Sequence, residues 1–102
     1  PSGENIYPEE IEAKLNALPY VQEQIVISDK NKLVALVYPD MDMVKRDGLQ
    51  IADLEQIMEQ NKQYLNDNLP KYMQVTRIQL QEKEFEKTPK QSIKRFLYEI
   101  RN

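Results

Sequence analysis

The chain has 102 residues, 40% hydrophobic and 30% charged, which suits one small globular domain with one core. It contains no His and no Cys, which excludes histidine triads, thiol nucleophiles, disulfides and Cys/His zinc sites. The formal net charge is −3, and the only two glycines, Gly3 and Gly48, lie too far apart for a dinucleotide-binding fingerprint or a phosphate-binding loop.

The first half of the sequence predicts a helix followed by a β-hairpin. Residues 8–18 begin with a proline and acidic residues, and their apolar positions form one helical stripe. Residues 21–28 and 33–38 are apolar and rich in β-branched residues, with a polar turn at 29–32 between them. Because residues 33–37 are apolar in succession, both faces of the sheet must be covered, and we expect the chain's own helices to cover them.

The second half predicts a helix, a third strand and a final helix. Residues 40–48 are interpreted as a charged connection, and the pattern from residue 51 to 65 is helical. Residues 75–80 alternate in polarity near their end, which is typical of a half-exposed strand. The last helix is predicted to start at the N-cap Thr88. Its expected buried stripe is Ile93, Phe96, Leu97 and Ile100.

These elements predict an α+β fold, with a small three-stranded sheet that includes a β-hairpin and about three packed helices. No apolar run approaches the length of a membrane span, and the first residues have no signal-peptide core. We therefore expect a soluble, cytoplasmic protein.

Two segments have sequences more specific than those of an ordinary small domain. Residues 2–12 read Ser-Gly-Glu-Asn-Ile-Tyr-Pro-Glu-Glu-Ile-Glu, and residues 85–96 read Phe-Glu-Lys-Thr-Pro-Lys-Gln-Ser-Ile-Lys-Arg-Phe. Together they resemble the C-terminal lid domain of the adenylate-forming (AMP-binding) enzymes. The residue sequence of the first segment is most like that of long-chain fatty acyl-CoA synthetases. The resemblance extends over essentially the whole chain, 1–102.

The resemblance implies a mobile C-terminal domain of an ATP-dependent, AMP-forming acyl-CoA synthetase, which converts a fatty acid, ATP and CoA into acyl-CoA, AMP and diphosphate. A larger N-terminal domain, absent from this chain, would hold ATP or AMP, Mg²⁺ and the acyl-adenylate. No metal ligands are expected in the chain itself. The resemblance places the start of the chain just after the interdomain hinge, so the isolated domain is expected to be inactive.

The second motif departs from the family pattern at its most important position. That pattern is Lys-Thr-x-x-Gly-Lys-Ile-x-Arg, in which the second lysine assists adenylate formation. In this chain Gln91 and Ser92 stand where the glycine and that lysine are expected. The positions that match are Lys87, Thr88, Ile93 and Arg95.

Lys90 is the candidate for the missing cation. Adenylation needs positive charge where the carboxylate meets the α-phosphate, and serine cannot supply it. A lysine in the first turn of the predicted helix would oppose the helix dipole, a cost that a bound anion would relieve. The alternative is that Lys90 is a solvated surface residue beside an ordinary helix cap.

The first motif carries the second candidate site. By resemblance, Gly3, Glu4 and Asn5 belong to a loop that lines the pantetheine tunnel of CoA, where a residue without Cβ allows close approach of the ligand. The alternative is an ordinary loop glycine before a helix. The acids that follow, including Glu12, are interpreted as favourable charges at a helix start rather than as catalytic groups or a cation site.

Two other classes of function remain open from the sequence. The chain could be a catalytically silent or free-standing protein interaction module, for which Gln91 and Ser92 are the best indication. It could also bind anions or nucleic acid through residues 83–102, which carry six basic and three acidic side chains. Because acids interrupt the basic residues and the pI is about 5.0, we expect no nucleic-acid partner. Membrane contact is left undetermined.

Overall fold

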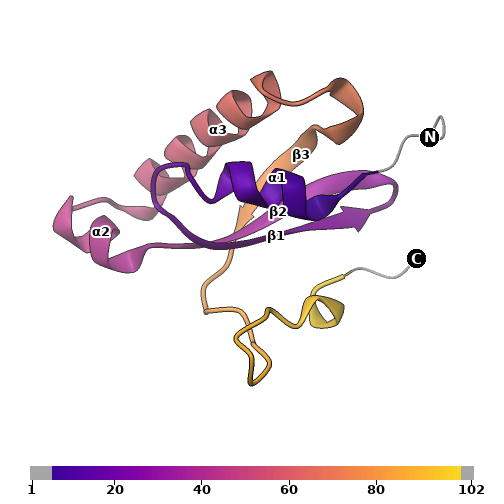
Figure 1. Cartoon of the computed structure of the whole chain (residues 1–102). Coiled ribbons are helices and arrows are strands. Elements are labelled where there is room, and N and C mark those ends of the chain that lie inside the picture. Colours follow the sequence, from indigo (N-terminus) through magenta and orange to yellow (C-terminus); the bar gives the residue numbers. More distant parts are fainter. Residues whose placement is uncertain (1–5, 100–102) are drawn as a thin grey trace.

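The computed structural model describes residues 6–99, which form three helices, a three-stranded sheet and two short 3₁₀ turns (Figure 1). The predicted α+β class is therefore confirmed. The elements, in chain order, are α1 (Pro8–Leu15), β1 (Val21–Asp29), β2 (Lys32–Pro39), α2 (Met41–Arg46), α3 (Ile51–Asp67), η1 (Lys71–Met73), β3 (Val75–Leu80) and η2 (Arg95–Leu97).

The sheet is mixed, with the strand order β1-β2-β3. The first two strands form the predicted hairpin and pair antiparallel, with Ile25 opposite Leu36. The third pairs parallel to β2, which requires a crossover connection, and α2 and α3 supply it. The central strand β2 is buried on both faces, as its run of consecutive apolar residues predicts.

Helices α1 and α3 cover one face of this sheet, and both lie above it in Figure 1. Ile11 and Leu15 of α1 are fully buried there, as the predicted helical stripe requires. Leu54, Met58 and Leu65 fill the same core from α3. The longest predicted helix and its buried positions are thus confirmed.

The opposite face is covered by residues 81–99 and not by helices, which corrects our expectation for this face. That segment runs below the sheet in Figure 1. Phe85, only 3% exposed, lies over the side chains of the hairpin, and Tyr98 meets its ring edge-on at 5.0 Å between centroids. The buried residues of this second core are Ile25, Ile27, Val34, Leu36 and Phe85.

The predicted final helix is wrong. Residues 88–94 form a turn and a bridge in place of a helix, and only the short 3₁₀ turn η2 follows. Ile93 is half-buried, but Phe96 and Leu97 are exposed, and Ile100 lies outside the described residues. The helical spacing of apolar residues was misleading because pairing with residues 86–88 and packing on the sheet decide the conformation.

One short helix, α2, occupies the segment that we interpreted as a connection. Asp40 begins it, and its side chain accepts a hydrogen bond from the backbone N–H of Met43 at 3.2 Å. Six residues are too few to show a clear helical period in sequence. Within residues 6–99 no helix has the length and apolar character needed to cross a bilayer.

Candidate functional site

Residues 86–94 form a small hairpin that projects from the second face of the sheet. Its two arms are joined by hydrogen bonds from Thr88 N–H to the Ser92 carbonyl and from Lys94 N–H to the Glu86 carbonyl, both 2.8 Å. A β-bridge between Lys87 and Ile93 lies between these bonds. The loop that they enclose, residues 88–92, is called the 88–92 turn below.

Gln91 has a left-handed backbone, with φ of +66°. Its N–H donates to the Thr88 carbonyl at 2.8 Å, and the Thr88 hydroxyl accepts from the Ser92 N–H at 3.3 Å. This is the pattern of a three-residue hairpin loop that ends in a left-handed residue, a position that favours glycine. The family pattern has glycine at this position, and Gln91 adopts the left-handed conformation there at a cost in backbone strain.

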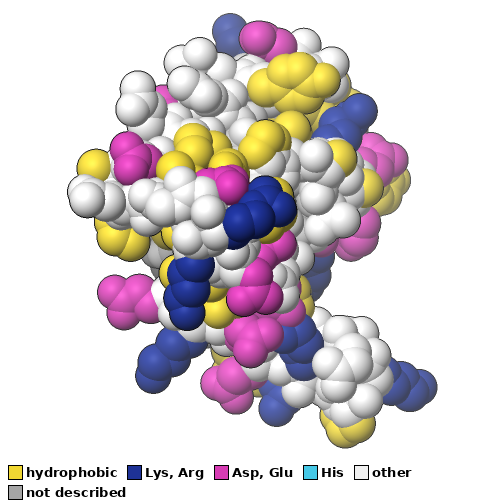
Figure 2. Space-filling view, turned by 90° about the vertical axis from the view of Figure 1, so that its left-hand side faces the viewer, with side chains coloured by type: hydrophobic (Ala, Val, Ile, Leu, Met, Phe, Trp, Pro, Cys, Tyr) yellow, Lys and Arg dark blue, Asp and Glu magenta, His cyan; other side chains and the backbone are white. Residues whose placement is uncertain are grey.

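Lys90 and Ser92 are both exposed on the 88–92 turn. Within residues 6–99 the Lys90 side chain takes part in no hydrogen bond or ion pair, and because the residue is exposed its charge is accessible to solvent. The lowest lobe of the molecule in Figure 2, which holds this hairpin, carries dark blue side chains on its flanks. Our argument from a helix dipole is wrong for Lys90, because no helix begins there; the exposed position itself remains compatible with an anionic ligand.

Lys87, at the first foot of the hairpin, is turned inward and pairs with the carboxylate of Glu23 on β1. The other oxygen of Glu23 accepts the backbone N–H of Phe85 at 3.3 Å. The hydrogen bond to Glu23 is the main cause that raises the pKa of Lys87 above its ordinary value. Lys87 therefore acts as a structural cation that attaches the foot of the hairpin to β1.

Arg95, at the other foot, pairs with Glu12 of α1, whose exposed fraction is only 9%. The same two side chains satisfy the outer edge of β1 at Val26. Its N–H donates to the Glu12 carboxylate at 2.7 Å, and its carbonyl accepts from Arg95 at 3.3 Å. The pair replaces a neighbouring strand at this point and blocks further pairing along the sheet edge.

Sequence reasoning missed the roles of Glu12 and Glu23. Glu12 had a readable signal, because it lies three residues before the buried Leu15 and so on the apolar side of α1. Its interpretation as a helix-start charge is incomplete, since it is a buried partner of Arg95. Glu23 carries no such signal, because its partner Lys87 is remote in sequence.

The candidate loop residues Gly3, Glu4 and Asn5 lie outside the described residues. Their assignment to a pantetheine tunnel stays a prediction.

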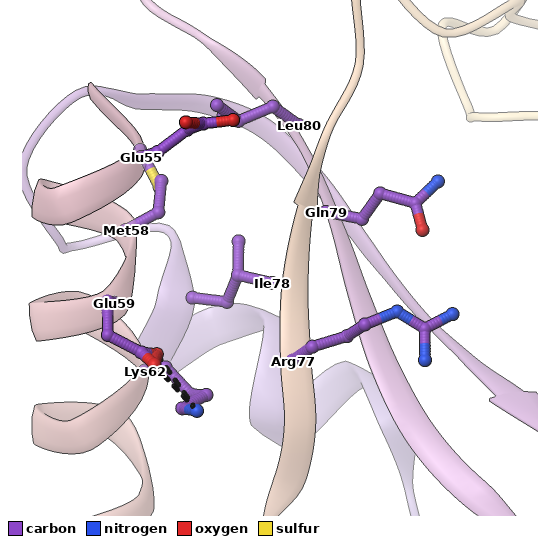
Figure 3. A pocket seen from close by; sticks show the side chains of 8 residues that line it. All are labelled: Glu55, Met58, Glu59, Lys62, Arg77, Ile78, Gln79 and Leu80. Atoms are coloured by element: carbon purple, nitrogen blue, oxygen red, sulfur yellow. Dashed lines mark hydrogen bonds and ion pairs between the residues drawn. The ribbon is translucent and has the colours of Figure 1, made fainter. Parts of the chain in front are cut away.

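A separate groove of about 510 Å³ lies between α3 and β3 (Figure 3). In that view Ile78 points from β3 toward α3, whereas Arg77 and Gln79 point away from the helix. Glu59 and Lys62 pair with each other across one helical turn at 2.9 Å. None of the predicted site residues lines this groove, so it is distinct from the 88–92 turn.

The site is thus an exposed turn with one lysine, whose two feet are held by ion pairs to β1 and α1. Comparison with known proteins identifies the class. The sequence profile of the family described as "AMP-binding enzyme C-terminal domain" matches residues 1–100. The chain belongs to this family of C-terminal domains of adenylate-forming enzymes, as the two motifs predict. A search of curated proteins finds no match.

Solved structures with the same fold include two CoA synthetases and the protein MatB. A Mycobacterium tuberculosis fatty acyl CoA synthetase is 25% identical over 93% of this chain, with a TM-score of 0.62. Apo MatB from Rhodopseudomonas palustris is 20% identical over 93%, also at 0.62. The O-succinylbenzoate CoA synthetase MenE from Bacillus subtilis is 20% identical over 92%, at 0.59. The chain spans only 17%, 18% and 17% of these structures, respectively.

Proposed function

We propose that this chain is the mobile C-terminal lid of an ATP-dependent, AMP-forming acyl-CoA synthetase that acts on fatty acids. The lid closes over a separate N-terminal domain during adenylation and then turns to line the pantetheine tunnel. In this proposal the N-terminal domain holds ATP and Mg²⁺. The fatty-acid assignment is supported by the wording of the first motif and by the similarity to the mycobacterial fatty acyl CoA synthetase.

The exposed 88–92 turn is the observation that carries the proposal. In the first half-reaction a carboxylate oxygen attacks the α-phosphorus of ATP, and diphosphate leaves. Negative charge shifts among the oxygens around phosphorus as this occurs, so a positioned cation lowers the barrier. Lys90 carries the only positive charge within the 88–92 turn, and its charge is accessible to solvent. We assign it to this role.

The second half-reaction uses the start of the chain. The thiol of CoA attacks the acyl carbon of the adenylate and loses its proton, the thioester bond forms, and the bond from the acyl carbon to the phosphate oxygen breaks, so that AMP leaves with the bonding electrons. We assign Gly3, Glu4 and Asn5 to the loop beside the pantetheine arm. A Gly3→Leu variant of the full-length protein is expected to form thioester from preformed acyl-adenylate more slowly. An unchanged rate would contradict the assignment.

The proposal is tested on the natural protein. An antibody against this chain, used on source cells under denaturing conditions, should detect a product several hundred residues longer than the 102-residue domain. That purified product should catalyse fatty-acid-dependent exchange of diphosphate into ATP. A product near 12.1 kDa, or a longer product without exchange activity toward any carboxylic acid, would overturn the proposal.

A second candidate is a catalytically silent interaction module. Ser92 favours it, because this exposed residue stands where the family pattern has its adenylation lysine and it brings no charge. In that case the full-length wild type would lack adenylation activity, and Ser92→Lys would restore it. Activity in the wild type would exclude this candidate.

A further inference from the structure

We infer that Glu23, which lies in neither motif, is a positioning residue for adenylation because it fixes the foot of the 88–92 turn through Lys87. The inference rests on the proposed function of that turn. Its basis is the way in which the hairpin is attached to the rest of the domain. Each of its feet is attached by a carboxylate from a different element.

The Glu23 carboxylate makes two contacts with the segment that leads into the hairpin. One carboxylate oxygen pairs with the Lys87 ammonium, and the other accepts the Phe85 N–H at 3.3 Å. Lys87 also donates to the Phe85 carbonyl at 3.2 Å. Both side chains are mostly buried, with 14% of the Glu23 side chain and 22% of the Lys87 side chain exposed. An ion pair shielded in this way keeps more of its strength than an exposed one.

Besides these two ion pairs, residues 86–95 are fixed by the half-buried Ile93, which packs on the second core, and by a hydrogen bond from the Glu86 N–H to the Tyr98 hydroxyl at 2.8 Å. The described hairpin has one β-bridge, from Lys87 to Ile93, and its tip is exposed. Beyond it, Arg95 is held by Glu12 on α1. The backbone hydrogen bonds of the tip fix only its internal shape, so its position depends on these attachments to the rest of the domain.

Position matters for the proposed chemistry. A catalytic cation must be held within about 0.5 Å of its productive place, and a misplacement of about 1 Å can cost about a hundredfold in rate. Loss of the Glu23 carboxylate would leave Lys87 to swing toward solvent and carry the first arm of the hairpin with it. The charge of Lys90 would then be present but displaced.

Glu23 is a better test of positioning than Glu12. Glu12 is buried and also satisfies the backbone of Val26, so its loss endangers the fold. Glu84 provides a matched control, because it also faces Lys87 but at 4.0 Å and with 63% of its side chain exposed. Glu84→Gln and Glu23→Gln remove the same charge, from a weak and from a strong contact.

The experiment measures both half-reactions in the full-length protein. Glu23→Gln should lower the kcat of adenylate formation about tenfold or more, with thioester formation from preformed acyl-adenylate unchanged. Glu84→Gln should change neither rate. The double variant Glu23→Lys with Lys87→Glu restores the ion pair with its charges reversed but not the two hydrogen bonds to the Phe85 backbone, so it should recover part of the lost adenylation.

Each other outcome counts against the inference. An equal fall in both half-reactions, without rescue by the reversed pair, would mean that Glu23 acts on folding alone. Unchanged adenylation in Glu23→Gln would exclude the positioning role. If Lys90→Ala still impaired adenylation in that case, the proposed function would stand while this inference failed. A wild type without adenylation would overturn both.

Discussion

Arg95 and Glu12 are 83 positions apart in the sequence, and their ion pair closes the outer edge of β1 at Val26. A sheet edge normally presents unpaired N–H and carbonyl groups that invite another strand. At this edge one side chain accepts the N–H and the other donates to the carbonyl. The pair also joins the first helix of the described chain to its last 3₁₀ turn.

Removal of Glu12 should therefore destabilise the whole domain. Glu12→Ala leaves the Val26 N–H and the Arg95 guanidinium without their partner, and loss of one member of a buried pair costs about 3–5 kcal/mol. Since 32% of the Arg95 side chain is exposed, we expect a value at or below the lower limit of that range, about 2–3 kcal/mol. Urea unfolding followed by circular dichroism measures it. Glu10→Ala, on the exposed side of α1, should change stability by less than about 0.5 kcal/mol.

The two phenylalanines distinguish the observed C-terminal segment from the predicted helix. Phe85→Ala removes a buried ring from the second core and should cost about 3–5 kcal/mol of unfolding free energy. Phe96 is 61% exposed, so Phe96→Ala should cost less than about 0.5 kcal/mol. A helix with Phe96 in its buried stripe would give a large loss for Phe96→Ala as well. Thermal and urea unfolding of both variants decide between the two arrangements.

Gln91 offers a test of backbone strain in the 88–92 turn. A residue other than glycine costs about 1–2 kcal/mol in the left-handed region, so Gln91→Gly should stabilise the chain by up to about 1 kcal/mol after its entropy cost. The same substitution at Gln56, which is exposed in α3, should lower stability by about 1 kcal/mol. A loss of stability at both positions would contradict a left-handed residue in this turn.

The Asp47 carboxylate makes the attachment of α2 sensitive to acid. Hydrogen bonds from Arg46, at 3.1 Å, and from the Tyr20 hydroxyl lower the pKa of Asp47 below its ordinary value of 3.8. A carboxyl with a lowered pKa stabilises the fold above its unfolded pKa, and the contribution is lost as the pH falls through its folded pKa.

Asp47→Asn should consequently destabilise the chain at pH 7, and the difference from the wild type should shrink as the pH is lowered toward 3. Urea unfolding at a series of pH values measures this. Glu55→Gln, a neutralisation in the exposed middle of α3, serves as the control and should show no such convergence. A constant difference between Asp47→Asn and wild type would refute the assigned contacts.

Local patterns predicted the sheet and the long helix, because their signals lie within single segments. The apolar run of β2 and the spacing of Leu54, Met58 and Leu65 each reflect contacts made by one element. For the final segment the local pattern gave a wrong prediction. Its apolar residues have helical spacing, but the left-handed Gln91 and the bridge from Lys87 to Ile93 set its course.

The sequence predicted which residues belong to the candidate site, but it did not predict their conformation or their ion-pair partners. The family resemblance pointed to Lys90 and to the substitution at Ser92, and both lie on the exposed turn. The resemblance does not indicate which side chains form ion pairs with Lys87 and Arg95. Their partners, Glu23 and Glu12, come from remote elements, and no local signal in a single sequence joins such pairs.

The most direct test of the account is the effect of Lys90→Ala on the two half-reactions of the full-length protein, with Lys83→Ala as a control for loss of an exposed lysine. We predict that adenylate formation falls by about a hundredfold or more, which is typical for loss of one electrostatic stabiliser. Thioester formation from preformed acyl-adenylate should stay within about twofold, and Lys83→Ala should resemble the wild type. Equal, small effects of Lys90→Ala on both half-reactions would contradict the central claim that this turn supplies the adenylation cation.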